Sequence, residues 1–344
     1  MFKNYRKIAK ISLVLVYLVI IAGAVVRMTG SGMGCPDWPK CFGHLIPPTN
    51  ESELQWQPNQ EYKEGQVIIR QESLQVATSD FMSNSEFNNT NWEAYTKHDY
   101  AKFNPWHTWI EFINRLFGAL AGLGTLVLAI ASFGYWKKKK RITILSFLVV
   151  FAMGFQAWLG ATVVYSVLEP VKITIHMIMA LVIVAMLLYL IFISNENRKL
   201  FTYNSKTSVF LIIVFGLTLI QIVLGTQVRQ FVDEQVAEVG ETAKNLWLST
   251  PAMSFYIHRS FSILVVLFNL YLAYRIYKLN LGLSKINWVL LILLIEVISG
   301  MAMFYLDFPF MSQALHLVLA SLLFGVQFYL VLESHISGRS PKTS

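Results

Sequence analysis

Charged residues are scarce in this chain. They account for 14% of its 344 residues, whereas hydrophobic residues account for 55%. Because a soluble domain carries about 25% charged residues, the composition excludes a soluble globular protein of this size. We therefore expect a polytopic membrane protein.

Cysteine is nearly absent, which limits the metal sites that the chain can form. Only Cys35 and Cys41 are present, and with the nearby His44 they provide three ligands where a structural zinc site uses four. A disulfide suits the two cysteines better if their segment faces an oxidising compartment. Two roles remain open: a bond that only staples its loop, and a redox-active pair that takes or relays electrons.

An import signal is also lacking. The N-terminus has no long Arg- and Ser-rich amphipathic presequence, and the first apolar run has no small-residue cleavage site after its basic start. We therefore expect that run to be retained as a membrane span. The same absence favours the bacterial plasma (inner) membrane over an organelle as the location.

Long apolar runs, in contrast, recur along the whole chain. Crossing ~30 Å of hydrocarbon takes about 20 residues. Runs that suit this length lie at residues 11–26, 109–136, 142–165, 173–193, 209–228, 252–274, 286–305 and 311–332. The sequence thus predicts an all-α polytopic membrane protein with eight transmembrane helices.

Basic residues gather on one side of these helices. Their clusters are Lys3, Arg6, Lys7 and Lys10; residues 137–141; Arg198, Lys199 and Lys206; Arg275, Lys278 and Lys285; and Arg339 and Lys342. The positive-inside rule then predicts that both termini are cytoplasmic and that the long segments 28–107 and 230–251 lie on the external, periplasmic side. Since these short loops supply much of the net charge of +8, the charge does not indicate nucleic-acid binding.

The two halves of the chain resemble each other. Residues 112–117 align with 256–261, and His176 and His316 each follow a glycine, Gly160 and Gly300, by 16 positions. Four helices in each half give a parallel repeat about an axis along the membrane normal. We expect an N-terminal four-helix half, residues 1–200 with the long external loop 28–107, and a C-terminal four-helix half, residues 201–344.

The membrane histidines are distributed unequally between these halves. The second half has His258 and His316, whereas the first has His176 and, in the place of His258, Asn114. Two neutral imidazoles facing each other in an apolar bundle are the ligands that a six-coordinate haem iron needs. A single membrane histidine can also serve only in an interhelical hydrogen bond. We predict that one half holds a haem permanently and that the other holds one loosely.

The other histidines have less specific surroundings. His44, His98 and His335 lie in loops or at helix edges and are expected at the surface. His107 precedes Asn114 by two helical turns on the same face, from where it could approach a bound group from outside.

One carboxylate lies beside the first of these positions. Glu111 precedes Asn114 by three residues, so both project from one helix face. It can act as an acid/base or charge stabiliser beside a reacting centre, or form only an ion pair with Arg115. The second half has no carboxylate at the matching position, three residues before His258, which assigns any catalysis to the first half.

Arginines recur near the external membrane edge, where haem propionates would emerge. They are Arg27, Arg115, Arg229 and Arg259. Guanidinium groups pair well with carboxylates, although edge arginines also extend to lipid headgroups without any ligand. Glu296, near mid-membrane, takes the place that Gln156 and Gln221 take elsewhere in the repeat and is expected to be only a hydrogen-bond partner.

Three features together resemble the haem A synthase family of cytochrome oxidase biogenesis. They are the stretch Gly30-Ser-Gly-Met-Gly-Cys-Pro-Asp-Trp-Pro-Lys-Cys41, the Glu111-x-x-Asn114-Arg115 element, and the histidines of the fourth, sixth and eighth helices. The resemblance covers nearly all of the chain except about residues 51–100. It implies an oxidoreductase that converts the C8 methyl of haem O to the formyl of haem A by successive hydroxylations, with water as the expected oxygen source and haem b as cofactor.

The resemblance also assigns residues and partners. It implies that His258 and His316 ligate haem b, with Arg259 and Arg229 nearby, and that the substrate haem site contains Glu111, Asn114, His176, His107, Arg115 and Arg27. Its partners would be haem O, haem O synthase, oxidase assembly factors and the lipid bilayer, with a homo-oligomer left open.

Two departures from the family keep other functions open. The family usually has histidine at position 114, and many bacterial relatives carry a second cysteine pair that segment 230–251 lacks. One alternative is a non-catalytic haem-binding protein for assembly or transfer. The other is a bis-histidine membrane cytochrome b, which predicts ligand pairs at both membrane faces although every candidate here lies near the external face.

Overall fold

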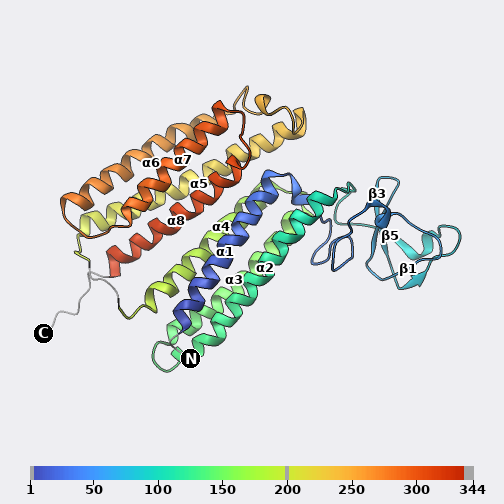
Figure 1. Cartoon of the computed structure of the whole chain (residues 1–344), viewed down its shortest axis with the longest axis horizontal. Coiled ribbons are helices and arrows are strands. Elements are labelled where there is room, and N and C mark those ends of the chain that lie inside the picture. Colours follow the sequence, from blue (N-terminus) through green and yellow to red (C-terminus); the bar gives the residue numbers. More distant parts are fainter. Residues whose placement is uncertain (1–3, 198–200, 337–344) are drawn as a thin grey trace. The chain divides into compact units, whose positions relative to one another are not determined.

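Eight helices dominate the computed structural model of the protein, which describes residues 4–197 and 201–336 (Figure 1). They are α1 (Tyr5–Met28), α2 (Pro105–Ser132), α3 (Lys140–Tyr165), α4 (Pro170–Ile193), α5 (Ser205–Val239), α6 (Met253–Lys278), α7 (Ile286–Tyr305) and α8 (Ser312–Ile336). All are long and apolar enough to cross a membrane, where a helix satisfies its backbone polar groups internally. The predicted multi-pass helical protein is confirmed.

The placement of the termini stays a prediction. Five of the basic residues that support it, Lys3, Arg198, Lys199, Arg339 and Lys342, lie outside the described residues.

Short 3₁₀ helices complete the helical elements: η2 (Ser31–Met33), η3 (Glu51–Leu54), η4 (Asn89–Asn91), η5 (Phe133–Tyr135) and η6 (Lys244–Leu246).

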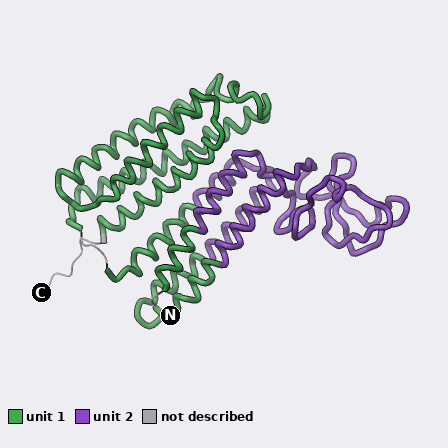
Figure 2. Tube along the Cα trace, viewed as in Figure 1, with its two compact units in different colours: residues 1–14, 124–150, 180–344 green, residues 15–123, 151–179 purple. Residues whose placement is uncertain are grey.

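The chain forms two compact units (Figure 2). Unit 1 comprises residues 1–14, 124–150 and 180–344, and unit 2 comprises residues 15–123 and 151–179. The boundary passes through α1, α2, α3 and α4, so unit 2 holds one end of each of these helices together with the long segment between α1 and α2. The division into halves at about residue 200, and the parallel repeat, stay predictions.

Within unit 1, α5, α6, α7 and α8 close into a four-helix bundle (Figure 1). Helix α5 packs on α6 and α8, and α7 packs on the same two helices. The interior consists of aliphatic side chains such as Leu211, Leu272, Val289 and Leu330, each at most 1% exposed. This bundle positions the histidines of α6 and α8.

Helix α5 runs further than the sequence predicts. Residues 230–239, expected in the external loop, continue the helix to Val239. Val232, Val236 and Val239 fall on one face, where they pack with Trp247 and Phe308. An i,i+4 ion pair at 2.6 Å between Arg229 and Asp233 supports the same turns. The apolar cluster therefore extends the helix beyond its hydrophobic run.

The long segment between α1 and α2, in unit 2, contains a small β-domain. Its strands are β1 (Glu61–Tyr62), β2 (Val67–Arg70), β3 (Ser73–Ala77), β4 (Phe81–Met82) and β5 (Trp92–Ala94). They form an antiparallel sheet in the order β2-β3-β5 and a pair β1-β4 (Figure 1). The all-α prediction missed these strands.

Aromatic packing gives this domain a core of its own. The ring of Trp92 contacts the rings of Tyr62, Phe81 and Phe87, beside the buried Ile68. A second cluster joins Cys35, Cys41, Phe42, Leu54, Val67 and Leu74. The cysteine segment is thus held from one side by the β-domain.

Candidate functional site

His316 on α8 is held by two polar groups of α7. Its Nδ1 lies 2.7 Å from Glu296 Oε2 and 2.8 Å from Ser299 Oγ. Glu296 and Ser299 are buried. A histidine that binds a metal through one ring nitrogen usually donates the other to a carboxylate or carbonyl, which fixes the ring and its tautomer. The contacts on Nδ1 therefore leave Nε2 as the nitrogen for a ligand bond.

His258 on α6 faces this ring. The two imidazole centres are 6.5 Å apart with their planes at 70°. Two imidazoles bound on opposite sides of one metal ion, each with its nitrogen about 2 Å from it, have ring centres about 6 Å apart. The buried Nδ1 of His258 has no hydrogen-bond partner among the described residues. The separation of the two rings suits a bis-histidine haem iron, and their role as its ligands stays a prediction.

A glycine of the preceding helix packs against each membrane histidine. A Cβ built on Gly160 would lie 3.3 Å from His176 Cε1, one on Gly225 3.2 Å from His258 Cε1, and one on Gly300 3.5 Å from His316 Cε1. The first two distances are tighter than ordinary van der Waals contact. The repeated glycines therefore set the position of the rings.

A polar side chain four residues before each glycine contacts the same histidine. Gln156 Nε2 lies 3.3 Å from His176 Nε2 and donates to the His176 carbonyl at 3.0 Å. Gln221 makes the same two contacts with His258, at 3.4 and 3.1 Å. Glu296 contacts the His316 ring, as described above. His176 of the first half thus has the same kind of contacts as the second half's pair, and its role as a haem ligand stays a prediction.

Asn114 on α2 has different surroundings. A Cβ on Gly23 of α1 would lie 3.8 Å from Asn114 Oδ1, an ordinary contact. The residue four positions before Gly23 is Val19, which offers no polar group. Asn114 Oδ1 is buried without a hydrogen-bond partner among the described residues.

His107 lies near the start of α2, beside the loop that follows α1. A Cβ on Gly34 would collide with the backbone of His107 and Thr108, and Thr108 Oγ1 donates to the Gly34 carbonyl at 2.7 Å. Seven residues of helix separate His107 from Asn114, a rise of about 10 Å. At that separation along α2, the His107 ring does not occupy the position of the Asn114 side chain.

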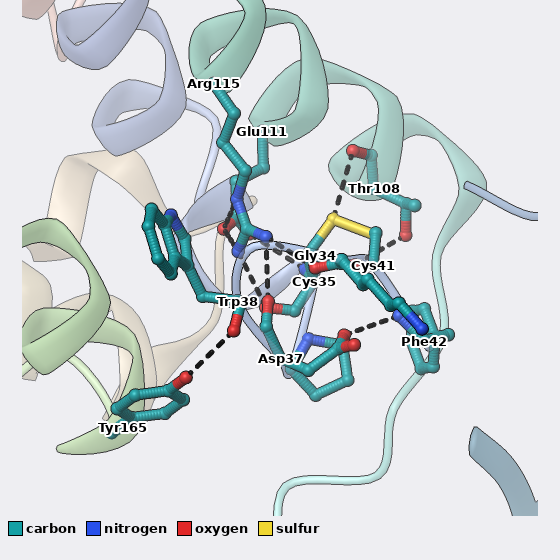
Figure 3. Close-up of polar contacts among 12 residues, drawn as sticks. Gly34, Cys35, Asp37, Trp38, Cys41, Phe42, Thr108, Glu111, Arg115 and Tyr165 are labelled. Carbon is teal, nitrogen blue, oxygen red and sulfur yellow. Dashed lines mark hydrogen bonds and ion pairs between the residues drawn. A yellow bond between two sulfur atoms is a disulfide. The ribbon is translucent and has the colours of Figure 1, made fainter. Parts of the chain in front are cut away.

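Glu111 and Arg115 bind the Cys35–Cys41 loop (Figure 3). Cys35 N–H donates to Glu111 Oε2 at 2.8 Å, and Arg115 pairs with Glu111 Oε1 at 2.5 Å. The same guanidinium donates to the carbonyls of Cys35, Asp37 and Lys40. Glu111 is only 4% exposed. Both carboxylate oxygens are engaged, so these contacts favour the ion pair over a free acid/base.

The loop itself is closed by the predicted disulfide between Cys35 and Cys41, whose Cα atoms are 4.8 Å apart. Asp37 accepts the backbone N–H of Phe42 and of Gly43. Burial raises the pKa of the Asp37 carboxyl, while these hydrogen bonds and the Arg115 guanidinium act in the opposite direction. Sequence reasoning did not single out Asp37, although its place inside the cysteine motif was a signal.

Two residues expected at the surface or in a helix also contact this loop. His98 Nε2 lies 2.9 Å from the Pro36 carbonyl, and the Tyr165 hydroxyl of α3 donates to the Trp38 carbonyl at 3.1 Å (Figure 3). His98 is therefore part of the loop's support rather than a free surface residue. His44 is half-buried too, and burial lowers its pKa.

The edge arginines have separate partners. Arg229 pairs with Asp233 and donates to Gln313 of α8. Arg259 donates to the Tyr305 hydroxyl at 3.3 Å, and Arg27 lies in the last turn of α1. Their contact with haem propionates stays a prediction, whereas Arg115 is committed to the loop.

Comparison of the sequence with known proteins shows the family of the chain. The profile of the COX15-CtaA family, described as "Cytochrome oxidase assembly protein", matches residues 6–328. A Heme A synthase of Shewanella oneidensis is 30% identical over 58% of this chain and 48% of its own length, about half of that relative. Heme A synthases of Rickettsia prowazekii and Alkalihalophilus pseudofirmus are 24% and 23% identical over 92% and 96% of this chain, and over 93% and 98% of their own lengths.

Proposed function

The chain belongs to the COX15-CtaA family of cytochrome oxidase assembly proteins, and from this premise we propose that it is a haem A synthase. Its substrate is haem O, and its product is haem A, formed by oxidation of the C8 methyl to a formyl group with water as the oxygen source. The support is twofold. Curated relatives over more than nine-tenths of the chain are named Heme A synthase, and His258 and His316 face each other at a separation that suits haem iron.

The C-terminal histidine pair, His258 and His316, is assigned to haem b. When bound there, haem b supplies one-electron redox chemistry. His258 and His316 would hold it, and Glu296 with Ser299 orients the His316 ring. Arg229 and Arg259 are assigned to the propionate edge.

The N-terminal site is assigned to haem O. His176 ligates it, because this side chain has the glycine and glutamine contacts that surround His258. Glu111 and Arg115 act as positioning residues that fix the Cys35–Cys41 loop to α2. A direct acid/base role for Glu111 stays a prediction, as does a place for His107 and Arg27 near the substrate.

The location that we propose is the bacterial plasma (inner) membrane, with the β-domain on the external side. Haem O synthase and cytochrome oxidase assembly factors are the proposed partners. One observation keeps a haem-transfer protein as a second candidate: Asn114 offers the N-terminal site a weaker group than histidine, and a weakly held haem leaves easily.

The deciding experiment is extraction and chromatography of the haems that copurify with the protein from a host that supplies haem O. We expect haem A or its hydroxylated precursor together with haem B. Haem B alone would favour an electron carrier, and unchanged haem O beside haem B would favour a transfer protein. His176→Ala is the matched variant, which should keep haem B and lose the product.

A further inference from the structure

The helix pairs of the two halves share one local design with a single exception. In α3/α4, α5/α6 and α7/α8 a glycine abuts a histidine ring, and a glutamine or glutamate four residues before that glycine contacts the same histidine. In α1/α2 the glycine is retained as Gly23. The histidine is replaced by Asn114, and the polar residue is replaced by Val19. Ligand and support are missing together.

The loss of both groups argues against Asn114 as a substitute ligand. A metal-binding side chain is normally held by a hydrogen-bond partner, and Val19 offers none. A neutral carboxamide is also absent from the usual axial ligands of haem, which are histidine, cysteine, methionine and tyrosine. Asn114 keeps a buried Oδ1 without a partner among the described residues, and leaving such an atom unsatisfied is unfavourable. This atom can accept a hydrogen bond from a small molecule beside it.

The ionisable neighbours on α2 are committed elsewhere. Glu111 and Arg115 are bound to each other and to the loop, and His107 lies about 10 Å along the helix from Asn114. The contact at Gly23 is also looser than the tightest of the three glycine–histidine contacts, 3.8 Å against 3.2 Å.

We propose that the haem held by His176 has an open sixth coordination position on the side of Asn114, which binds small neutral ligands such as water or carbon monoxide. This inference rests on the proposed function, because it needs a haem in the N-terminal site. Asn114 acts there as a hydrogen-bond acceptor for water rather than as a ligand itself, whereas carbon monoxide, which has no proton to donate, is only the probe of the open position. The C-terminal histidine pair leaves no such position.

The test uses the full-length protein, saturated with haem B, and carbon monoxide as the probe. Haem content per chain, spin state by optical and electron paramagnetic resonance spectroscopy, and the carbon monoxide difference spectrum of the reduced protein are measured. We expect two haems per chain, one low-spin and unreactive and one high-spin that binds one carbon monoxide. The double variant Val19→Gln/Asn114→His rebuilds the missing pair and should lower carbon monoxide binding at least tenfold while converting the high-spin signal to low-spin.

The outcomes separate this inference from the function on which it rests. Two low-spin haems that ignore carbon monoxide in the unaltered protein would overturn the open position, and a high-spin signal gained in His107→Ala would identify His107 as the ligand after all. A single haem per chain that disappears in His258→Ala would show that the N-terminal site holds none, which defeats the proposed function. The low-spin haem of the C-terminal pair serves as the internal control for folding in every variant that keeps both His258 and His316.

Discussion

The two candidate sites use the same contacts to different degrees. The C-terminal site has two histidines, each with a glycine against its ring and a polar partner, and the partner of His316 is the carboxylate of Glu296. The N-terminal site has one such histidine, His176, and a fourth position where Asn114 has a glycine but lacks the polar partner. A site with two supported imidazoles suits a permanent cofactor, whereas a site with one suits a molecule that arrives, reacts and leaves.

Removing a ligand of the C-terminal pair should have the largest effect. In His258→Ala or His316→Ala we expect the low-spin haem b spectrum of the purified protein to disappear, because one imidazole cannot hold the iron in six-coordination. His335→Ala, near the other end of α8, is the control and should keep the spectrum. Haem b at full occupancy in both variants would show that neither histidine holds it, and the contrast drawn between the two sites would fail.

Glu111→Ala should leave haem b bound and abolish the product. Arg115 would lose its ion-pair partner and the Cys35 N–H would lose its acceptor. Breaking a buried pair costs about 3–5 kcal/mol, which loosens the Cys35–Cys41 loop on α2 although Arg115 keeps its bonds to the loop carbonyls. Haem A yield and protease sensitivity of the loop are the measurements. Glu169→Ala is the matched control, since it breaks an exposed pair with Lys172 at 2.9 Å, worth about 0–1 kcal/mol. Normal haem A formation in Glu111→Ala would exclude any role for this carboxylate.

Glu296→Gln should make the partner of His316 resemble those of the other two histidines. The His316 ring would lose its anionic acceptor, so we expect about a tenfold weaker haem affinity and a higher reduction potential, with the low-spin spectrum retained. Redox potentiometry and haem titration measure the change. Glu238→Gln removes an exposed carboxylate of the same unit and should change neither value. Equal values in both variants would mean that the carboxylate does not distinguish the two sites.

The sequence predicted the repeated elements and the membrane-spanning helices. Eight apolar runs became eight helices because hydrocarbon tolerates only internally bonded backbone, and the facing of His258 and His316 followed from equal spacings in two halves. The strands within residues 61–94 were not predicted, because they are short and depend on aromatic contacts between distant residues, such as Tyr62 with Trp92. Spacing also could not show that Arg115 binds three carbonyls of the loop, since such contacts depend on tertiary placement.

The glycines offer the finest comparison between the sites, with the smallest expected effects. Gly160→Ala would place a methyl group 3.3 Å from the His176 ring, whereas Gly23→Ala would place one 3.8 Å from Asn114. Overpacking costs about 1–3 kcal/mol, so we expect Gly160→Ala to weaken haem binding at the N-terminal site several-fold and Gly23→Ala to leave it unchanged. Haem titration of the two variants measures the difference.

Gly154→Ala, also on α3, is the control for this pair, because a Cβ there would meet no neighbouring atom within 4 Å among the described residues. If Gly23→Ala were as harmful as Gly160→Ala, the space beside Asn114 would be as tight as that beside a ligating histidine. The N-terminal site would then lack the room for a small ligand, and its difference from the C-terminal site would reduce to the identity of one side chain. If only Gly160→Ala is harmful, the looser packing at Gly23 distinguishes the Asn114 position from the His176 position, because the same substitution beside each of them gives a different result.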